Sequence, residues 1–256
     1  MSRHVVVTGA ASGIGAAVVD ELKQAGDRVT ALDLKDAPAA DTSITCDLSD
    51  PASIDSAVAK LADVDVLLNV AGVPGTLPDD VVFAVNFLGL RHLTEAVLPL
   101  INDRGAIVNV ASIAGMTHTF NAALHKELLL TATGWEDGAK ALAASKPDGF
   151  PAYNFTKEAV ILYTGLAAPK QCARGVRVNA VSPGPVETPI LPDFEDSMGK
   201  DVIEGARAVA GRHGTVADIA PVIVFLASPA AGWINGQNLI ADGGLMALGQ
   251  TMAALA

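Results

Sequence analysis

Short runs of apolar residues alternate along the chain with longer stretches in which apolar and polar residues mix. The apolar runs, each short enough for one strand, lie at residues 5–7, 28–33, 43–48, 64–70, 106–110, 177–181 and 239–241. The mixed stretches have the length of helices, most clearly at residues 16–25, 79–101 and 216–226. Nearly continuous apolar strands are typical of a parallel sheet covered on both faces, and strands that alternate with helices form right-handed βαβ units. The pattern therefore predicts an α/β fold, a doubly wound parallel sheet with helices on both faces.

The first predicted strand runs directly into a glycine-rich turn. Gly9, Gly13 and Gly15 fall within the stretch Thr8–Gly15, and a helix is predicted from Ala16 onward. A strand that turns through glycines into a helix directs backbone N–H groups and the positive end of the helix dipole at one spot, which suits a phosphate group. The spacing differs from G-x-G-x-x-G and from the phosphate loop G-x4-G-K-[ST], because no lysine follows. A glycine turn without a ligand is the alternative.

An acidic residue closes the second predicted strand. Asp33 lies 18 residues after Gly15, close to the position at which a carboxylate meets the adenosine ribose in dinucleotide-binding folds. There it would accept hydrogen bonds from both ribose hydroxyls and repel a 2′-phosphate. The glycine turn contains no Arg or Lys to offset that repulsion, so we predict NAD rather than NADP, with Lys35 the one nearby residue that would weaken the preference. A solvated acid at a strand end is the alternative.

Composition and charge limit the classes of protein that this chain can represent. Its 256 residues are 50% hydrophobic and 18% charged, which excludes a disordered protein and fits one domain over residues 1–256. The net charge of −11 argues against nucleic-acid and membrane partners. Cys46 and Cys172 indicate no disulfide framework, and we see no export leader, so we expect a cytoplasmic protein. The five histidines show no metal-binding spacing, and no metal site is predicted.

Further motifs follow in order along nearly the whole chain. The full series is Thr8–Gly15, Asp47-Leu48, Asn69-Val70-Ala71-Gly72, Asn86, Ser112, Tyr153-x3-Lys157, Pro183-Gly184 and Asp242-Gly243-Gly244. Each motif alone is weak, but the ordered set resembles the short-chain dehydrogenase/reductase family. The family often has a second Asn where this chain has Val70. The resemblance implies a Rossmann-like fold, a nicotinamide cofactor, and hydride transfer between that cofactor and an alcohol or carbonyl substrate.

Four residues are implied as catalytic by this resemblance: Asn86, Ser112, Tyr153 and Lys157. Tyr153 and Lys157 are four residues apart, so on a helix they share one face. A cation about 4 Å from a phenolate stabilises it by about 4 kcal/mol at an effective dielectric constant of about 20. We therefore expect Lys157 to lower the pKa of Tyr153, which would exchange a proton with the substrate oxygen while Ser112 hydrogen-bonds that oxygen. In the family, the lysine also binds the nicotinamide ribose, and the asparagine holds a water of a proton relay.

The resemblance also implies cofactor-binding residues at many strand ends. Asp47 is expected near the adenine amino group, and the loop after the sixth strand near the nicotinamide amide and the diphosphate. Residues 188–210, in which apolar and acidic positions mix, are expected to form a mobile lid over the substrate. The cofactor set comprises Gly9, Ser12, Gly13, Ile14, Gly15, Asp33, Leu34, Asp47, Leu48, Asn69, Ala71, Gly72, Tyr153, Lys157, Pro183, Gly184, Val186 and Thr188.

The spacing between Ser112 and Tyr153 is unusual for the family. The two residues are 41 positions apart, far more than in most members, so residues 116–151 form an insertion between the fifth strand and the Tyr-x3-Lys helix. Helices are predicted within it at residues 121–133, capped by Asn121, and at residues 135–146. Loops of this length are usually functional.

Two interpretations of the insertion stay open, and both can hold. In the first it walls the substrate cleft, with apolar surface from Met116, Phe120 and Leu124 and with His118 as a candidate to touch the substrate. In the second it covers a surface that relatives use for subunit packing.

The insertion and Asp33 make the pattern most similar to bacterial 3α-hydroxysteroid dehydrogenase/carbonyl reductases, and coniferyl-alcohol dehydrogenases are similar too. We predict an NAD-dependent oxidoreductase that interconverts an alcohol and a ketone or aldehyde, with a small apolar substrate of the hydroxysteroid type. An aryl or allylic alcohol dehydrogenase of the coniferyl-alcohol type is the alternative. An NAD-binding protein without turnover, and a lyase or epimerase with tightly held NAD, are further alternatives. We expect a homodimer, with a homotetramer as the alternative.

Overall fold

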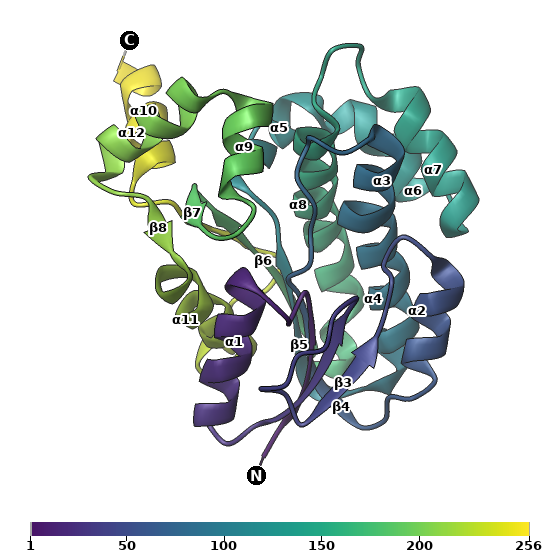
Figure 1. The fold of residues 1–256 in the computed structure, drawn as a ribbon. Helices are drawn as coiled ribbons and strands as arrows, with labels where there is room; N and C mark the ends of the chain where they lie inside the picture. The colour runs from purple at the N-terminus through teal and green to yellow at the C-terminus, as the bar shows by residue number, and fades with distance from the viewer. Residues whose placement is uncertain (1, 256) are drawn as a thin grey trace.

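One large parallel sheet forms the centre of the structure, a computed structural model that describes residues 2–255 (Figure 1). Within these residues its strand order is β3-β2-β1-β4-β5-β6-β9. From β1 the chain builds outward through β2 and β3, then returns to place β4 on the other side of β1, so the connections switch direction beside β1. The strands are β1 His4–Thr8, β2 Arg28–Asp33, β3 Thr42–Thr45, β4 Val64–Asn69, β5 Ile101–Val110, β6 Arg177–Pro183 and β9 Asn238–Ala241, and a small separate pair is β7 Val186–Glu187 with β8 Gly214–Thr215.

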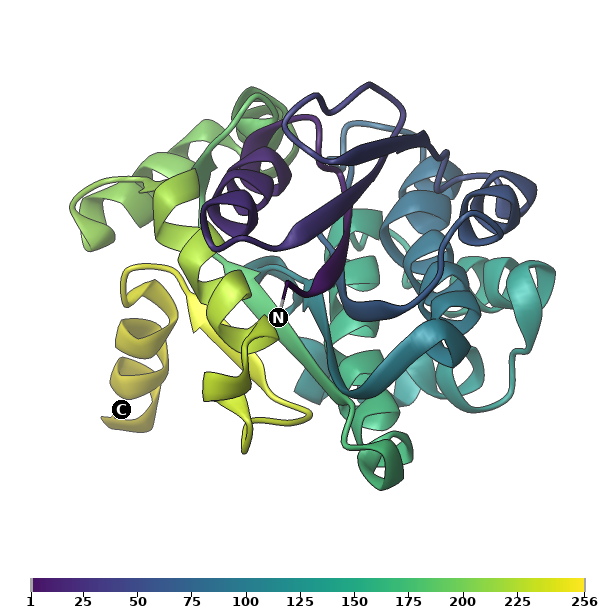
Figure 2. The same ribbon diagram turned by 90° about the horizontal axis from the view of Figure 1, so that it is seen from below.

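Helices cover both faces of this sheet (Figure 2). Successive side chains of a strand point to opposite faces, so Val5 and Val7 of β1 join the core on one face and Val6 joins the core on the other. The predicted doubly wound α/β fold is therefore confirmed. The first face carries α1 (Gly13–Gln24) and α11 (Val216–Ala227), and the second carries α2 (Pro51–Val58), α3 (Asp79–Phe83), α4 (Leu90–Val97) and α8 (Ala152–Lys170).

The helix predicted over residues 79–101 is a continuous helical run that changes type along its length. A π-helix at Ala84–Gly89 joins α3 to α4, and a 3₁₀ turn at Leu98–Leu100 ends the run. Gly89 lies so close to Leu48 that a Cβ would be 2.2 Å from the Leu48 carbonyl oxygen. The run is apolar and long enough to cross a membrane, but 61% of its most apolar window is buried in the fold, as in a core helix.

Other boundaries also differ from those predicted: β5 begins at Ile101 and not at residue 106, and β6 extends to Pro183. The third strand ends at Thr45 and not at residue 48, because Asp47 Oδ1 accepts a hydrogen bond from Ser49 N at 2.8 Å and turns the chain toward α2. After the predicted closing turn, a further helix, α12 (Leu245–Leu255), continues to the end of the described chain. It stands out from the rest of the molecule (Figure 1).

The insertion is largely helical. The prediction that Asn121 caps a helix is wrong: the backbone is already helical from His118, and the Asn121 side chain donates to Glu158 of α8 at 2.8 Å. A second contact comes from α4, where the Arg91 guanidinium donates to the carbonyl oxygens of Leu128 at 3.0 Å and Gly134 at 2.6 Å. The insertion contains α5 (His118–Asn121), a 3₁₀ turn (Ala122–His125), α6 (Lys126–Leu130) and α7 (Gly134–Ser145), the last close to the predicted helix at 135–146.

Candidate active site

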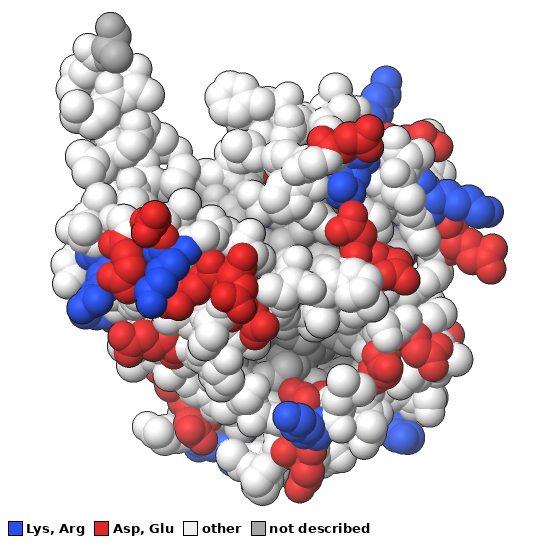
Figure 3. Space-filling view, turned by 45° about the horizontal axis from the view of Figure 1, so that its top comes forward, with Lys and Arg blue, Asp and Glu red and all other residues white. Residues whose placement is uncertain are grey.

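The carboxyl ends of β1, β2, β4, β5 and β6 open into one cavity of about 950 Å³. Helices α9 (Leu191–Met198) and α10 (Lys200–Ala210) cover its outer side. Figure 3 shows the hollow near the centre of this face, among mostly uncharged surface atoms. Ligands of open α/β sheets bind at this edge, beside the point where the connections switch direction. The predicted residues that line the cavity are Gly9, Ser12, Gly13, Ile14, Gly15, Asp33, Leu34, Asp47, Leu48, Ala71, Gly72, Ser112, Tyr153, Lys157, Pro183, Gly184, Val186 and Thr188.

The glycine turn requires its glycines. Gly9 and Gly13 have positive φ angles of +66° and +56°, which side-chain-bearing residues rarely adopt. A Cβ on Gly15 would lie 2.0 Å from the Gly9 carbonyl oxygen, so α1 can begin this close to β1 only with glycine there. Within residues 2–255, no side chain caps the first turn of α1 and no acidic residue lies in it. Its N–H donors and positive dipole end therefore face the cavity, which suits a diphosphate group.

Asp33 closes β2 at the same end of the cavity. Its carboxylate accepts hydrogen bonds from Ala11 N and Lys35 N, both at 3.0 Å, so it also holds the glycine turn in place. Asp47 lines the cavity nearby, and its Oδ1 accepts from the backbone and hydroxyl of Ser49 at 2.8 and 2.6 Å. Apart from the buried Lys157, Lys35 is the one cation among the described residues that line the cavity.

In the described part of the chain, two predicted site residues, Asn69 and Asn86, lie outside the cavity lining. Asn69 Nδ2 donates to Thr94 Oγ1 at 2.9 Å and to Asn109 Oδ1 at 2.8 Å, within the buried core. Asn86, in the π-helix, makes two hydrogen bonds with the backbone of Val73, donating to its oxygen at 2.9 Å and accepting from its nitrogen at 2.8 Å. Both side chains therefore support the strand and the loop beneath the cavity.

Ser112, Tyr153 and Lys157 meet at the other end of the cavity. Tyr153 and Lys157, on α8, are 7% and 3% exposed. Lys157 Nζ donates to the carbonyl oxygen of Val110, the last residue of β5, at 2.9 Å, and it lies 5.6 Å from the centre of the Tyr153 ring. Ser112 lies two residues after the end of β5, and its Oγ accepts a hydrogen bond from Ala114 N at 3.1 Å; it lines the cavity with Tyr153 and Lys157. Helix α8 and strand β5 thus place one hydroxyl, one phenol and one ammonium group together.

Burial dominates the ionisation of this cluster. It raises the pKa of Tyr153 to about 12, and the hydrogen bond with Ser112 acts in the opposite direction. Burial also lowers the pKa of Lys157 to about 8. The expected lowering of the pKa of Tyr153 is wrong for this structure, because burial of the phenol is the largest cause and raises that pKa. At neutral pH the phenol therefore holds its proton, and most of the lysine is still charged.

The lid contributes an aromatic contact that the sequence analysis did not identify. The ring of Phe194, on α9, packs with its edge toward Tyr153, at 5.0 Å between ring centres and 60° between planes. Leu191 and Met198 of the same helix line the cavity with it, and Thr76 hydrogen-bonds Asp193 at 3.4 Å. The cavity wall next to the phenol is therefore apolar. A single Phe in a mixed helical segment gave no signal for this contact.

The insertion contributes little to this wall. Met116, His118, Phe120 and Leu124 all lie outside the cavity lining as far as the structure describes it, and the Phe120 side chain is 87% exposed. His118 Nδ1 instead bonds the carbonyl oxygen of Gly115 at 3.0 Å. The interpretation that Met116, Phe120 and Leu124 wall the substrate cleft is therefore wrong, and His118 lies outside the described cavity lining as well.

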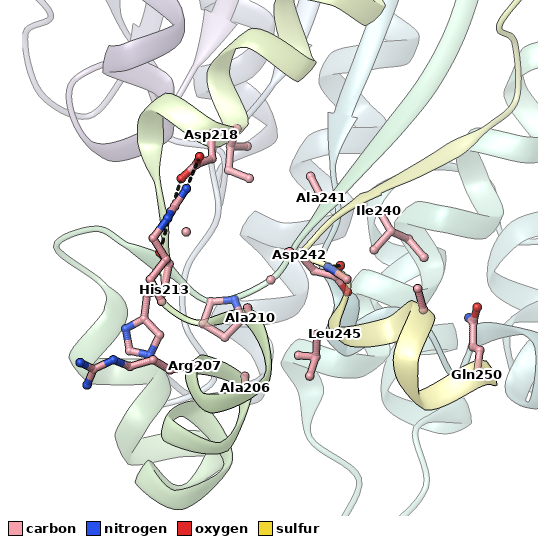
Figure 4. Close-up of a pocket in the computed structure, with 18 residues that line it drawn as sticks. Ala206, Arg207, Ala210, His213, Asp218, Ile240, Ala241, Asp242, Leu245 and Gln250 are labelled. Carbon is pink, nitrogen blue, oxygen red and sulfur yellow. Dashed lines mark hydrogen bonds and ion pairs between the residues drawn. The ribbon is translucent and has the colours of Figure 1, made fainter. Parts of the chain in front are cut away.

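A smaller cavity of about 460 Å³ adjoins the main one, between α10, α11 and α12 (Figure 4). Its main ion pair joins Arg212 to Asp218 at 2.7 Å. The Asp242 carboxylate accepts hydrogen bonds from Gly244 N at 2.9 Å and Met246 N at 2.7 Å, which attaches α12 to the end of β9. Leu245 lines both cavities, so the start of α12 belongs to the site as well.

Comparisons with known proteins place the chain in a family. Residues 3–124 match the family model described as short chain dehydrogenase, and residues 140–246 match that described as enoyl-(acyl carrier protein) reductase. The chain is 38% identical over 248 residues to a coniferyl-alcohol dehydrogenase of Pseudomonas sp. (strain HR199 / DSM 7063), covering 95% of this chain and 96% of the relative. It is 31% identical over 260 residues to a 3-alpha-hydroxysteroid dehydrogenase/carbonyl reductase of Comamonas testosteroni, with the same coverage.

A solved structure is similar over almost the whole chain. It is the 3-alpha-hydroxysteroid dehydrogenase from Pseudomonas sp. B-0831 in complex with NADH, with a TM-score of 0.83 and 32% sequence identity. The similarity covers 97% of this chain and 98% of that one. Because 97% of this chain is covered, the similarity includes the insertion and the lid.

Proposed function

This chain belongs to the short-chain dehydrogenase/reductase family as an oxidoreductase that acts on alcohols, and we propose that it uses NAD to interconvert an apolar alcohol and its ketone or aldehyde. One observation carries the proposal: a single cavity has the glycine turn and Asp33 at one end and Ser112, Tyr153 and Lys157 at the other. A nicotinamide cofactor that extends between these ends would bring its reactive ring to the phenol.

The residues at the first end fit NAD. The donors at the start of α1 suit its diphosphate, and the Asp33 carboxylate suits the two hydroxyls of an adenosine ribose. A 2′-phosphate on that ribose would meet the negative charge of Asp33, with Lys35 as the nearby compensating cation. The similar structure in complex with NADH supports the same choice. When bound, the nicotinamide supplies or accepts the hydride at the substrate carbon.

The residues at the second end handle the proton. Tyr153, protonated at neutral pH, donates its proton to the oxygen of a carbonyl substrate, and the Ser112 hydroxyl holds that oxygen in place. In the direction of alcohol oxidation, Tyr153 must take up the proton, and the adjacent charge of Lys157 favours the phenolate then required. The water relay through Asn86 remains an implication of the family resemblance.

The substrate that we propose is apolar, because Leu191, Phe194 and Met198 of the lid line the cavity and Phe194 packs on Tyr153. A hydroxysteroid-like secondary alcohol fits a wall of this kind. An aryl or allylic alcohol of the coniferyl type is the second candidate, and the aromatic ring of Phe194 beside the phenol favours it, because planar substrates stack on such a ring.

We also propose that two copies of the chain associate through β9 and α12. Strand β9 is at the edge of the sheet, and α12 contains no charged residue. Leu239, Leu248, Met252 and Leu255 expose 40%, 48%, 60% and 77% of their surface. Exposed apolar surface of this kind marks an interaction site, and a two-fold dimer would bury the same face of both copies. Light scattering should give the mass of a dimer; a tetramer would require a second interface, and a monomer would contradict the proposal.

The test of the reaction is an assay of NADH formation with NAD and a panel of secondary, aryl and allylic alcohols. We expect turnover with apolar members of the panel and much weaker turnover with NADP. An NAD-binding protein without turnover would bind NADH, seen by its fluorescence, but would form none from any alcohol, and that result would contradict the proposal.

A further inference from the structure

A buried carboxylate lies next to Lys157 on helix α8. Glu158 is fully buried (0% exposed), and its three side-chain partners all come from the insertion. Thr117 Oγ1 and Asn121 Nδ2 donate to Oε1, the latter at 2.8 Å, and His125 Nε2 lies 2.8 Å from Oε2. A buried carboxylate is strongly unfavourable without such partners. These four residues, the Glu158 cluster, therefore hold the insertion against α8.

The spacing of the three partners is regular. Thr117, Asn121 and His125 are four residues apart, so they follow one side of the helical segment that begins the insertion. The His125 ring also stacks on Phe155 of α8, at 4.1 Å between ring centres and 27° between planes. The segment thus lies along α8, with its polar side on Glu158 and an aromatic contact beside it.

The Glu158 carboxylate is an anion in this setting. Burial alone would raise its pKa, but the hydrogen bonds from His125, Thr117 and Asn121 together hold the pKa below its usual range. The charge makes these hydrogen bonds stronger than bonds between neutral groups.

The segment between Ser112 and Thr117 is held closely at both ends. It begins at the end of β5 with Ser112 and reaches the Glu158 cluster at Thr117, only five residues later. Between them, a Cβ on Gly115 would lie 2.6 Å from the Lys157 carbonyl carbon and 2.8 Å from Glu158 N. The segment therefore packs directly against the backbone of α8 at Lys157 and Glu158, one helical turn after Tyr153.

We propose that Glu158 is a positioning residue, which through Thr117 and the insertion fixes Ser112 relative to Tyr153. The inference rests on the proposed function, in which Ser112 and Tyr153 hold the same substrate oxygen. A displacement of about 1 Å at a reacting group lowers turnover by up to about 100-fold. The apolar wall beside Tyr153 comes from α9, and within residues 2–255 no hydrogen bond joins the Glu158 cluster to α9, so we expect KM to be unaffected. The insertion thus serves the geometry of proton transfer and does not select the substrate.

The test compares variants of the Glu158 cluster. H125F keeps the stacked ring but removes the donor, and E158Q keeps the side-chain size but removes the charge. We expect kcat to fall about 10- to 100-fold in each, while KM and the Kd for NADH stay within about two-fold. H125Q, whose amide N–H can reach the place of Nε2, should recover most of the lost kcat. The control is R91M, which loosens the insertion at α4: we expect lower thermal stability but wild-type kcat.

Several outcomes would overturn the proposal. Wild-type kcat in folded H125F and E158Q would show that the Glu158 cluster does not position Ser112. A fall in kcat of R91M as large as that of E158Q would show that loosening the insertion anywhere is enough. If the wild-type protein turned over no alcohol, the proposed function would fail, and amide hydrogen exchange would decide the inference. Faster exchange in residues 112–117 of E158Q, but not in α12, would support the positioning, and unchanged exchange there would contradict it.

Discussion

The two ends of the cavity are built in different ways. The cofactor end consists of backbone and strand ends, where Gly9 and Gly13 adopt positive φ angles and Gly15 touches Gly9. The outer wall of the substrate end consists of side chains on α9 and α10. Within residues 2–255, the hydrogen bond from Thr76 to Asp193, at 3.4 Å, joins this wall to the loop before α3. The first end is therefore fixed by local stereochemistry, and the second depends on packing between distant segments.

This difference separates the two specificities. A substitution on the lid can change the choice of substrate without disturbing the glycine turn, which we expect to bind the cofactor diphosphate. A side chain added to the turn would instead disturb cofactor binding. Ser112, Tyr153 and Lys157 stand at the second end too, but strand β5 and helix α8 place them there and not the lid. Substitutions at each place test whether the separation is real.

The largest effect is expected at Tyr153, which the lid contacts through Phe194. Y153F removes the proton donor but keeps the buried ring, so kcat should fall by about 10³-fold, the usual contribution of a general acid. The Kd for NADH, followed by fluorescence, should remain that of the wild-type protein. The control is Y163F, at a buried tyrosine on the same helix that lies outside the described cavity lining. A Y153F enzyme that keeps more than about a tenth of its turnover would contradict the role of Tyr153.

At the cofactor end, G15A places a methyl group 2.0 Å from the Gly9 carbonyl oxygen. We expect the free energy of unfolding to fall by about 3 kcal/mol, with loss of NADH binding because the start of α1 moves. The measurements are urea denaturation and NADH fluorescence. G205A on the exposed side of α10 is the control, because a Cβ there meets no atom of the described residues within 4 Å. Equal stability of both variants would show that the turn is not rigid.

A smaller effect is expected from the charge at Asp33. D33S keeps a hydrogen-bonding group but removes the repulsion of a 2′-phosphate, so the preference for NAD over NADP should fall about 10- to 100-fold. KM for the alcohol should not change, because this carboxylate is at the other end of the cavity. D36N, at an exposed acid close in sequence, is the matched control. An unchanged cofactor preference in D33S would show that Asp33 does not determine the preference for NAD.

The smallest effect is expected at the lid. F194A removes the ring that packs on Tyr153, and we expect KM for an apolar alcohol to rise about ten-fold, with an unchanged Kd for NADH. F120A truncates the exposed ring of the insertion and should leave both constants unchanged. A rise in KM for F120A equal to that for F194A would restore the insertion as a wall of the substrate site.

Features that depend on neighbouring residues could be predicted from the sequence. The strand, turn and helix around Gly9–Gly15 follow from apolar runs and glycine spacing, and the shared face of Tyr153 and Lys157 follows from the helical repeat. Asp33 ends its strand at the cavity, as its distance from the glycine turn predicts. The doubly wound sheet follows from the same alternation over the whole chain.

Features that depend on contacts between distant residues could not be predicted from the sequence. Asn121 has the residue type of a helix cap, but its partner is Glu158, 37 positions away, and nothing near Asn121 indicates it. The contact of Phe194 with Tyr153 depends on how α9 folds back over the cavity. The direction of the pKa shift of Tyr153 was predicted wrongly because the attraction of Lys157 can be estimated from spacing, whereas the extent of burial cannot.

The insertion is joined to the rest of the molecule by two buried charges of opposite sign, each on a different helix. The Glu158 carboxylate of α8 and the Arg91 guanidinium of α4 both find their hydrogen-bond partners in it. A shorter connection from Ser112 to Tyr153 would leave one anion and one cation without those partners. The insertion and these two residues are therefore expected to evolve together. A descendant that loses the insertion must also replace Glu158 and Arg91 by uncharged residues.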